Sequence, residues 1–315
     1  MNPIIEIKDL VKYFDTNAGV VHALDHVDLR INQGETFGIV GESGCGKTTL
    51  GRCSVNLVPP TSGQVLYRGR DIFTCSKSEK KQLKKEMQII FQDPYASLDP
   101  RNTVFSIIAE AIKVHKAYTT KSDITEQVES IMDTVGLARR LSDTYPHELD
   151  GGRRQRIGIA RALVLNPEFV VCDEPVSALD VSIQAQILNL MMDIQEERGL
   201  SYMFITHDLS VVKHISNSIA VMYLGEVVEY SPTEELFQHP CHPYTKALLS
   251  AIPRLDISGR HSKRDMIKGE VSSPIDPKPG CRFTPRCSHA SDACASENIP
   301  LKEVSSGHFL RCCLF

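Results

Sequence analysis

The sequence predicts an α/β protein with a mainly parallel sheet, and two patterns lead to this prediction. Short apolar runs typical of buried strands alternate along the chain with segments of helical periodicity. Two of these runs lead into glycine-rich or acidic residues, which is where open α/β sheets bind their ligands. With 315 residues and an apolar content of 42%, the chain is long enough for one large or two modest domains with a sizeable core.

The first expected unit is a strand, a glycine loop and a helix. Residues 36–41, TFGIVG, form an apolar run that predicts a strand. The following KTTLGRCSVNLV has helix-compatible spacing until Pro59 and Pro60. This order places a glycine-rich turn between the strand and the helix.

Two further helices are expected. The first spans residues 122–136, begins with a cap formed by Asp123 and Glu126, and ends at Gly136. The second spans about residues 182–198 and leads into the strand-like YMFIT. Each carries an apolar stripe at helical spacing: Ile124, Val128, Ile131 and Val135 in the first, and Ile183, Ile187, Leu190 and Ile194 in the second.

A buried strand and a domain boundary complete the expected layout. FVVCDEP, residues 169–175, predicts a central strand with two carboxylates at its carboxyl end. After Pro253 the chain becomes rich in Pro, Gly and Ser, with few candidate elements. We therefore place a boundary near residue 254 and expect domains over residues 1–253 and 254–315.

Charge and cysteine content limit the classes of partner and site. The 35 basic and 39 acidic residues give a net charge of −4, so no basic excess points to nucleic acid or to an anionic membrane surface. No apolar stretch is long enough to span a bilayer, and the start, MNPIIEIKDL, lacks the layout of a signal peptide. We therefore expect a cytoplasmic protein in which the ten cysteines do not form structural disulfides.

Residues 41–49, GESGCGKTT, fit the pattern G-x-x-x-x-G-K-S/T between a predicted strand and a predicted helix. The backbone N–H groups of such a loop can wrap a polyphosphate. Lys47 can reach the outer phosphates, and the Thr48 hydroxyl can ligate Mg²⁺. The candidate nucleotide-binding residues of the loop are Gly41, Glu42, Ser43, Gly44, Cys45, Gly46, Lys47, Thr48 and Thr49.

Two carboxylates at the end of the predicted central strand complete a nucleotide site. Asp173 is placed to bind the metal through a water molecule. Glu174, one residue further on, is placed to polarise a water in line with the outermost phosphate, which is the general-base role in hydrolysis. A charged strand end followed by a turn is the alternative, and the glycine loop favours the catalytic interpretation.

Six motifs together resemble a known family. GESGCGKTT is followed by FQDP, LDGGRRQR, VVCDEP, SALD and ITHD, and this order is similar to that in the nucleotide-binding subunits of ABC transporters. The resemblance covers residues 1 to about 250. It implies a P-loop nucleotide-binding domain with a mainly parallel core sheet, an antiparallel β subdomain and a helical subdomain at about residues 93–160. The cofactors that it implies are ATP and Mg²⁺.

The same resemblance assigns roles to residues outside the phosphate loop. Phe14 would stack on adenine, with Tyr13 as the less favoured register and core packing as the alternative for either. Gln92, in FQDP, would ligate Mg²⁺ and sense the transmembrane partner. His207, in ITHD, would contact the outermost phosphate, and Asp180, in SALD, would line the interface between two such subunits.

LDGGR corresponds to the LSGGQ-type signature of the family, whose helix N-terminus faces the outermost phosphate of an ATP held by a second subunit. Gly151 and Gly152 keep the close backbone approach. Asp150 stands where the family has serine, and Arg153 stands where it has glutamine. An aspartate is a good helix N-cap but a poor neighbour for phosphate, and Arg153 is the candidate compensator. The competence of this site stays open, and a heterodimer with a paralogous subunit is expected.

HPCHPYTKALLSAIP, residues 239–253, and the tail after it resemble the C-terminal extension of subunits in oligopeptide and dipeptide importers, a group that includes nickel importers. The resemblance implies an ATPase that energises peptide import as a peripheral protein on the cytoplasmic face of the membrane. Its partners would be a paralogous ABC ATPase, two transmembrane permease subunits and an extracytoplasmic solute-binding protein, with no nucleic acid. Nickel or another small solute is the alternative cargo, and a soluble ABC ATPase or a redox-responsive ATPase is the alternative function.

The loop-rich tail predicts a metal centre. Cys281, Cys287, Cys294 and Cys312 supply four thiolates where few apolar residues support a core, although free thiols are the alternative. Their spacings are wider than the paired C-x₂₋₄-C of zinc sites, which favours an iron-sulfur cluster over zinc. Some importer subunits with this tail are similar in carrying a four-iron (4Fe-4S) cluster. The possible substitutes for a ligand are Cys313 and, for zinc, His289 and His308.

Overall fold

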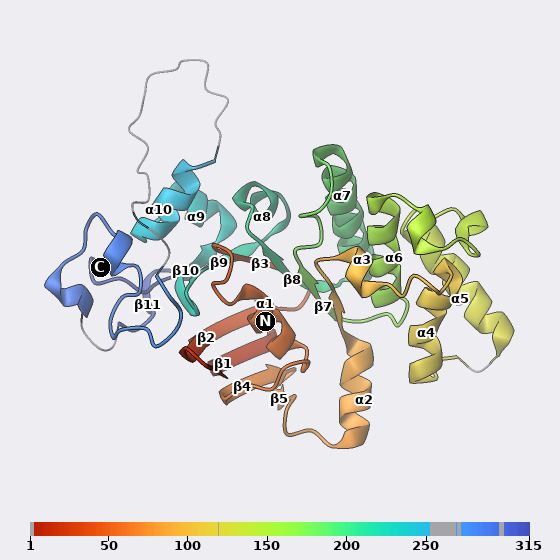
Figure 1. Ribbon diagram of the computed structural model, residues 1–315, viewed down its shortest axis with the longest axis horizontal. Helices are drawn as coiled ribbons and strands as arrows, with labels where there is room; N and C mark the ends of the chain where they lie inside the picture. The colour runs from red at the N-terminus through yellow and green to blue at the C-terminus, as the bar shows by residue number, and fades with distance from the viewer. Residues whose placement is uncertain (1–2, 119, 253–268, 270–271, 296–298) are drawn as a thin grey trace, which may run out of the picture.

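The computed structural model describes residues 3–118, 120–252, 269, 272–295 and 299–315. A large sheet runs through the middle of the molecule, with helices on one face and a smaller sheet on the other (Figure 1). A group of helices lies at one end and the C-terminal segment lies at the opposite end (Figure 1). The predicted α/β class is confirmed.

The large sheet contains, in spatial order, β11 (Lys302–Ser305), β12 (His308–Leu310), β10 (Glu226–Pro232), β9 (Ser218–Tyr223), β3 (Thr36–Val40), β8 (Ser201–Thr206), β7 (Phe169–Asp173) and β6 (Met87–Ile90). The strands β9, β3, β8, β7 and β6 run parallel to one another. The strands β11, β12 and β10 pair antiparallel with one another, and β10 pairs antiparallel with β9. The core of the sheet is therefore parallel, as the sequence predicts.

The smaller sheet is antiparallel and contains β2 (Gly19–Asn32), β1 (Pro3–Thr16), β4 (Ser62–Tyr67) and β5 (Arg70–Asp71) in that spatial order. The strands β1 and β2 form a long hairpin with several register shifts. This sheet is the antiparallel β subdomain that the family resemblance implies.

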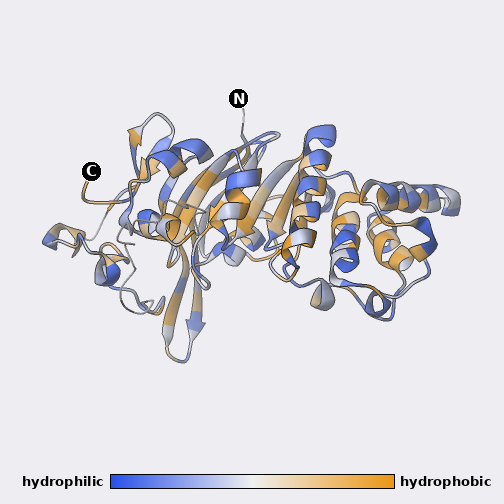
Figure 2. Ribbon diagram, turned by 90° about the horizontal axis from the view of Figure 1, so that it is seen from above, coloured by the Kyte–Doolittle hydropathy of each residue, from blue (hydrophilic) through white to orange (hydrophobic). Residues whose placement is uncertain are grey.

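The strands β3, β7 and β8 are buried along their whole length. Alternate residues of β3 enter different clusters: Phe37 and Ile39 pack with residues of the smaller sheet, and Val40 packs with residues of the helices. Burial on both faces explains why these strands are continuous apolar runs in the sequence. Figure 2 shows the resulting apolar strands at the centre of the molecule.

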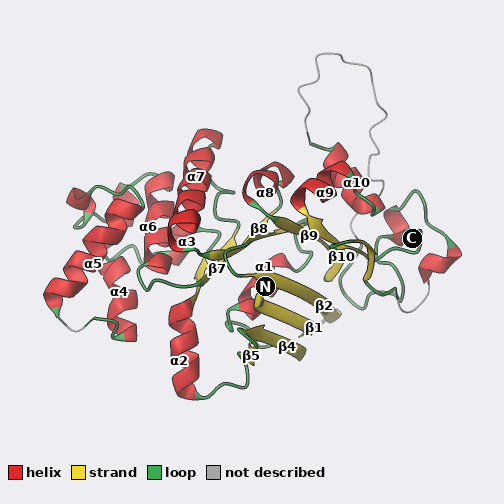
Figure 3. Ribbon diagram, turned by 180° about the vertical axis from the view of Figure 1, so that it is seen from behind, coloured by secondary structure: helices red, strands yellow, loops and turns green. Residues whose placement is uncertain are grey.

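Helix α1 (Lys47–Ser54) follows β3 directly, so the strand, glycine loop and helix occur in the predicted order. It ends before Pro59 because Asn56 already has a left-handed backbone, with φ 57°. Helices cover the face of the large sheet that lies opposite the smaller sheet (Figure 3). Helix α2 precedes β6 in the sequence. The helices outside the helical group are α2 (Lys77–Glu86), α7 (Val181–Arg198), α8 (Leu209–Ile215), α9 (Thr233–Gln238) and α10 (Pro243–Ser250).

The helical group lies between β6 and β7 in the sequence, where a helical subdomain at about residues 93–160 is expected. Within the described ranges, no helix is long and apolar enough to cross a membrane. The group contains α3 (Pro94–Ser97), α4 (Val104–His115), α5 (Lys121–Thr134), the 3-10 turns η1 (Arg139–Leu141) and η2 (Pro146–Glu148), and α6 (Gly151–Leu163).

Helix α5 is the first of the two further helices predicted, and its cap differs from the prediction. The N-cap is Thr120, whose hydroxyl accepts a hydrogen bond of 3.1 Å from the Asp123 N–H. The predicted cap of Asp123 with Glu126 is therefore wrong, because the helix begins before both residues. The apolar stripe is confirmed in its centre, where Val128 and Ile131 are buried.

Helix α7 is the second further helix, and its buried stripe differs in part from the predicted one. Ile187 and Ile194 are buried as predicted. Ile183 and Leu190 are only partly buried and pack against the core from its margin. The remaining buried positions of the helix are Leu188 and Met191.

The C-terminal segment continues the large sheet. In β12, Phe309 pairs with Tyr230 of β10, and the two rings stack with their centroids 5.4 Å apart. Two 3-10 turns, η3 (Thr284–Arg286) and η4 (Asp292–Ala295), precede β11 and β12. The predicted boundary near residue 254 lies outside the described residues, so a division there stays a prediction.

Candidate nucleotide site and cysteine cavity

Four loops bring predicted residues to one edge of the large sheet. The phosphate loop follows β3, Gln92 follows β6, Glu174 follows β7 and His207 follows β8. Because these strands are parallel, their carboxyl ends lie at the same edge, which is where α/β sheets bind ligands. Residues from three of the predicted motifs are therefore neighbours of the phosphate loop.

The phosphate loop passes so close to neighbouring backbone that it requires glycine. Gly41 has φ 156°, and a Cβ there would lie 2.2 Å from the Met222 carbonyl oxygen. Gly46 has φ 103°, and a Cβ there would lie 2.1 Å from the Ala23 carbonyl oxygen. Any side chain at these positions would displace the loop from β9 or from the hairpin.

Lys47 lies across this loop. Its side-chain Nζ donates hydrogen bonds to the carbonyl oxygens of Gly41, at 2.8 Å, and Glu42, at 2.9 Å. Lys47 is also the first residue of α1, whose N-terminus directs its free N–H groups into the loop. The loop thus combines backbone donors and one ammonium, which suits an anion with several phosphates.

Thr48 and Asp173 lie in contact beside the loop. The Thr48 hydroxyl donates to Asp173 Oδ1 at 2.9 Å, and Asp173 is almost completely buried. Burial raises the pKa of the Asp173 carboxyl, and the hydrogen bond from Thr48 opposes this change. A hydroxyl and a carboxylate oxygen held together are ligands that Mg²⁺ prefers.

Glu174 lies between two of the other predicted residues. Its Oε2 accepts a hydrogen bond of 2.9 Å from Gln92 Nε2, and its Oε1 lies 3.4 Å from His207 Nδ1. Its backbone is left-handed, with φ 47°, which is a strained conformation for a residue with a side chain. The Glu174 carboxylate is therefore held in one place by contacts to the loops after β6 and β8.

Tyr13 and Phe14 have different environments. The Tyr13 hydroxyl donates to Asp25 Oδ1 at 2.7 Å, and its ring stacks on His22 with centroids 3.9 Å apart. Burial and the hydrogen bond to Asp25 both raise the Tyr13 pKa. Phe14 is 40% exposed, with Lys12 Nζ 4.8 Å from its ring centroid. Of the two rings, Phe14 is the one with an open face.

The LDGGR segment begins α6. Asp150 is the N-cap, and its Oδ1 accepts a hydrogen bond of 2.8 Å from the Arg153 N–H. The Arg153 Nε lies 3.5 Å from Asp150 Oδ2, and both side chains are more than half exposed. A Cβ at Gly152 would lie 2.8 Å from Cγ2 of Ile183 in α7. Asp150 is therefore the helix cap, as its residue type predicts, and Arg153 lies close enough to pair with it.

The structure does not bring all the predicted residues together. Asp150, Gly151, Gly152 and Arg153 belong to the helical group, whereas the phosphate loop lies beside the large sheet (Figure 1). Asp180 precedes α7, is exposed, and makes no side-chain hydrogen bond to cap that helix. These residues are thus exposed or partly exposed, away from the chain's own phosphate loop.

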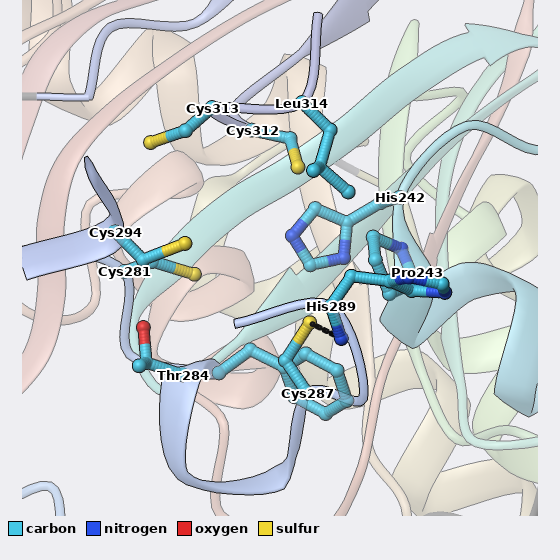
Figure 4. A pocket seen from close by; sticks show the side chains of 11 residues that line it. His242, Pro243, Cys281, Thr284, Cys287, His289, Cys294, Cys312, Cys313 and Leu314 are labelled. Atoms are coloured by element: carbon cyan, nitrogen blue, oxygen red, sulfur yellow. Dashed lines mark hydrogen bonds between the residues drawn. The ribbon is translucent and has the colours of Figure 1, made fainter. Parts of the chain in front are cut away.

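Cysteines from the C-terminal segment line one cavity, which we call the cysteine cavity. Its lining includes Cys281, Cys287, Cys294 and Cys312. Figure 4 shows the sulfurs of these four residues turned toward the same space. Burial raises the pKa of the Cys281 thiol to about 11, whereas a hydrogen bond from the Ser291 backbone is the main cause that lowers the pKa of Cys294. The four predicted ligands therefore come together.

His242 also lines the cysteine cavity, and sequence reasoning did not assign it a role. Its Nδ1 accepts a hydrogen bond of 3.0 Å from the Tyr244 N–H, so Nε2 carries the ring proton when the imidazole is neutral. Burial lowers its pKa to about 4. Its Nε2 is buried and has no hydrogen-bond partner among the described residues. A buried N–H donor beside four thiols suits a cavity that holds an anionic group.

The candidate substitute ligands differ in position. His289 lines the cysteine cavity. Cys313 also borders it: its thiol donates to the Ala293 carbonyl oxygen at 3.3 Å and is in hydrogen-bond contact with the thiol of Cys294. His308 does not line the cavity, because its Nε2 pairs with Oε1 of the buried Glu229 at 2.8 Å. His308 is therefore wrong as a substitute ligand.

Sequence reasoning also missed two arginines of the tail. Arg282 contacts Asp25, and Arg286 binds Glu42 of the phosphate loop. The two arginines lie between Cys281 and Cys287, and no motif distinguishes them from other basic residues. Their only signal in the sequence is this position between two predicted ligands.

The sequence matches the ABC transporter family over residues 24–177 and the C-terminal region of oligopeptide/dipeptide transporters over residues 228–294. It is 49% identical to a putative oligopeptide transport ATP-binding protein, YkfD, of Bacillus subtilis, over 99% of this chain and 96% of that protein. It is 46% identical to the oligopeptide transport ATP-binding protein OppF of Salmonella typhimurium, over 98% of this chain and 95% of that protein.

Solved structures of ABC cassettes share the fold. The protein cbiO1 of Clostridium perfringens, part of the ABC transporter complex cbiONQ, superimposes with a TM-score of 0.66 at 27% identity, over 76% of this chain and 92% of that one. The cassette MJ0796, in a dimeric state bound to ADP and phosphate, gives a TM-score of 0.67 at 26% identity, over 73% and 98%. With the phosphate loop, the paired carboxylates and the ordered motifs, these similarities show that the chain belongs to the ABC transporter family, as an ATP-hydrolysing subunit with the C-terminal region of the oligopeptide/dipeptide branch.

Proposed function

We propose that this chain hydrolyses ATP with Glu174 as the general base and thereby drives the import of peptides through a membrane-embedded permease. The observation that carries the assignment is the position of the Glu174 carboxylate, hydrogen-bonded to Gln92 and 3.4 Å from His207. A general base must be held at a fixed point relative to its water. The strained backbone of Glu174 and its two neighbours provide that restraint.

Each residue around the phosphate loop takes one part of the reaction. Lys47 and the backbone N–H groups of the loop bind the outer phosphates. Thr48, Asp173 and Gln92 hold Mg²⁺, which supplies positive charge against the phosphate oxygens. Glu174 accepts a proton from the attacking water, and His207 contacts the outermost phosphate. Phe14 stacks on adenine with its open face, because Tyr13 is already engaged by Asp25 and His22.

The second half of each site comes from another ATPase subunit. The N-terminus of α6, with Gly151 and Gly152, faces the outermost phosphate of the ATP bound by that subunit, and Asp180 lines the interface between them. Asp150 places a carboxylate at this point, so a pair of two identical chains would contain two weakened sites. The expected partner is a paralogous subunit with an intact signature, which leaves one strong site on Lys47 and Glu174 of this chain.

The rest of the assembly follows from the family. Relatives named as oligopeptide transport ATP-binding proteins support peptides as the cargo, with nickel or another small solute as the alternative. Two transmembrane permease subunits hold the ATPase pair at the cytoplasmic face of the membrane, and an extracytoplasmic solute-binding protein delivers the cargo. The charge balance of the chain favours no nucleic-acid partner.

The cysteine cavity binds a 4Fe-4S cluster through Cys281, Cys287, Cys294 and Cys312, with Zn²⁺ as the alternative. A single zinc ion at ~2.3 Å from each sulfur needs ligand atoms within roughly 4 Å of one another. Among the described residues, the group of three ligand atoms within 4.8 Å of one another is that of Glu229, Cys241 and His308, not the cavity cysteines. The wider gathering of sulfurs suits a cluster, and the His242 Nε2–H is placed to donate to it.

Glu174→Gln tests the catalytic assignment. The amide keeps the size and hydrogen-bonding capacity of the side chain but cannot accept the proton, so steady-state hydrolysis should fall at least ~100-fold while ATP binding persists. The measurement is phosphate release by the assembled complex together with ATP affinity. Lys47→Ala is the matched contrast, because it should lose binding as well. Near-normal turnover by the Glu174→Gln complex would remove Glu174 from the role of base.

A further inference from the structure

The carboxylate of Glu42, in the phosphate loop, is bound by a residue of the C-terminal segment. Arg286 Nη1 donates to Glu42 Oε2 at 2.7 Å, and Arg286 Nη2 donates to Glu42 Oε1 at 3.0 Å. The Arg286 side chain is only 7% exposed and that of Glu42 is 25% exposed. This is a two-point pair largely shielded from water, which is the strong class of charged hydrogen bond.

A second contact from the same region fixes the backbone of Glu42. The Glu42 N–H donates to the Tyr244 hydroxyl at 2.9 Å, and Tyr244 is completely buried in α10. The Tyr244 ring meets Tyr223 edge-on at 4.8 Å and packs against Phe283 at 5.3 Å. Tyr244 therefore has little freedom to move away from the phosphate loop.

Both contacts are linked to the phosphate-binding Lys47 through Glu42. The carbonyl oxygen of Glu42 accepts a hydrogen bond from Lys47 Nζ at 2.9 Å. The side chain, N–H and carbonyl of Glu42 are thus all engaged, by Arg286, Tyr244 and Lys47 respectively. A displacement of Glu42 would displace the ammonium that meets the outer phosphates.

Arg286 also neutralises a charge in an unfavourable place. A carboxylate within an anion-binding loop repels the phosphates, and the repulsion acts over the short distances at which screening by salt is incomplete. The guanidinium of Arg286 pairs with both oxygens of that carboxylate. Without it, Glu42 would either repel the nucleotide or turn toward water and move the loop.

The other arginine of the segment makes a parallel contact on the adenine side. Arg282 binds Asp25, and Asp25 Oδ1 accepts the hydrogen bond from Tyr13, which precedes Phe14. The Arg282 side chain is 6% exposed. The short segment between Cys281 and Cys287 therefore contacts the phosphate loop directly and is linked to the strand that carries Phe14 through Asp25 and Tyr13.

We propose that Arg286 is a positioning residue of the ATP site, which holds the phosphate loop in its binding geometry through Glu42 and cancels the charge of that side chain. Its side chain binds Glu42 and the Tyr223 hydroxyl, so it acts on the nucleotide through Glu42. Because the phosphate loop itself binds ATP, loss of Arg286 should lower the affinity for nucleotide, and a change in turnover should follow from that. No motif of the family assigns this role to Arg286, and the role rests on the ATP site proposed above.

The test is a double-mutant cycle on ATP affinity, measured by calorimetric titration of the full chain with a non-hydrolysable ATP analogue and Mg²⁺. Arg286→Met should raise the Kd about tenfold, which corresponds to ~1.4 kcal/mol. Glu42→Gln alone should raise the Kd by less than Arg286→Met does, because the amide oxygen can still accept one hydrogen bond from Arg286 and no carboxylate is left to repel the phosphates. In the double variant, Glu42→Gln should restore much of the affinity that Arg286→Met loses, because the unpaired charge is gone.

Two further variants keep the test decisive. Arg139→Met is the matched control, because it removes another arginine that binds a carboxylate, Asp133, within the helical group, and it should leave the Kd unchanged. Arg286→Lys keeps the charge but not the two-point geometry, so its Kd should be intermediate, and it replaces Arg286→Met if that variant fails to fold. An unchanged Kd in Arg286→Met or Arg286→Lys, or purely additive effects in the double variant, would overturn the proposal.

Discussion

Asp150 makes two local contacts through its carboxylate. Its carboxylate caps α6 through the Arg153 N–H and pairs with the Arg153 side chain. Exposed ion pairs of this kind contribute only about 0–1 kcal/mol. Two like charges ~4 Å apart repel by ~4 kcal/mol at an effective dielectric of ~20. Arg153 therefore compensates for only part of the repulsion that Asp150 would exert on a phosphate.

This imbalance predicts a gain of activity in a double substitution. Asp150→Ser with Arg153→Gln keeps an N-cap and removes the carboxylate, so ATP hydrolysis by the pair of identical chains should rise by about tenfold or more. The measurement is phosphate release at a protein concentration that favours the dimer. Asp150→Asn isolates the effect of charge, because it keeps the cap and removes only the charge, and it should also be faster. If neither variant is faster, Arg153 already neutralises the site and the electrostatic argument is wrong.

The secondary structure elements show what the sequence could predict and what it could not. The strands β3, β7 and β8 were predictable because burial on both faces leaves continuous apolar runs. The cap of α5 was not, because several residues near its start can accept a backbone hydrogen bond, and Thr120 precedes Asp123. The strand β11 escaped prediction because it is short and exposed along its whole length.

Some residues of the candidate site could likewise be predicted from the sequence, and others could not. Gln92, Glu174 and His207 were predictable because each belongs to a motif, and the structure places them together. Arg286 and His242 were not, because their importance depends on contacts made by the tertiary path of the tail. The sequence pattern of one segment cannot reveal a contact with a distant residue. Glu42 lies 244 positions before its partner Arg286.

The cysteine cavity yields a prediction for the tail as an element. The chain purified without oxygen should contain iron and acid-labile sulfide and show visible absorption, because four thiols and one buried N–H donor face the cavity. Cys287→Ser should lose the iron and the colour. Cys75→Ser is the matched control and should keep both, since the Cys75 thiol does not line the cavity.

Other metal contents would decide against the cluster. One zinc per chain without sulfide would replace it by a zinc centre. A colourless protein without bound metal would remove both metal proposals and leave five free thiols around the cavity.

The molecule as a whole predicts a specific set of partners. Purification of the tagged chain from detergent-extracted membranes should bring down a paralogous ATPase and two membrane-spanning proteins, because the proposed ATP sites are completed by a second subunit at the exposed Asp150 and Asp180. Mass spectrometry of the eluate identifies each component. Recovery of two copies of this chain alone, or of nucleic acid, would contradict the heterodimeric transporter.

Stimulation of ATP hydrolysis by a peptide-loaded binding protein, compared with the same protein loaded with nickel, would identify the cargo.

The long-range pair between Glu42 and Arg286 has a consequence for synthesis. The ribosome makes the phosphate loop 244 residues before it makes the arginine that holds it. At ~5–20 residues per second, the loop waits about 12–50 s for its partner. A chain that stops before residue 286 lacks the contact that holds Glu42, together with the strands β11 and β12 of the large sheet. From the role proposed for Arg286, a prematurely terminated product should bind ATP weakly and so should not withdraw nucleotide from complete chains.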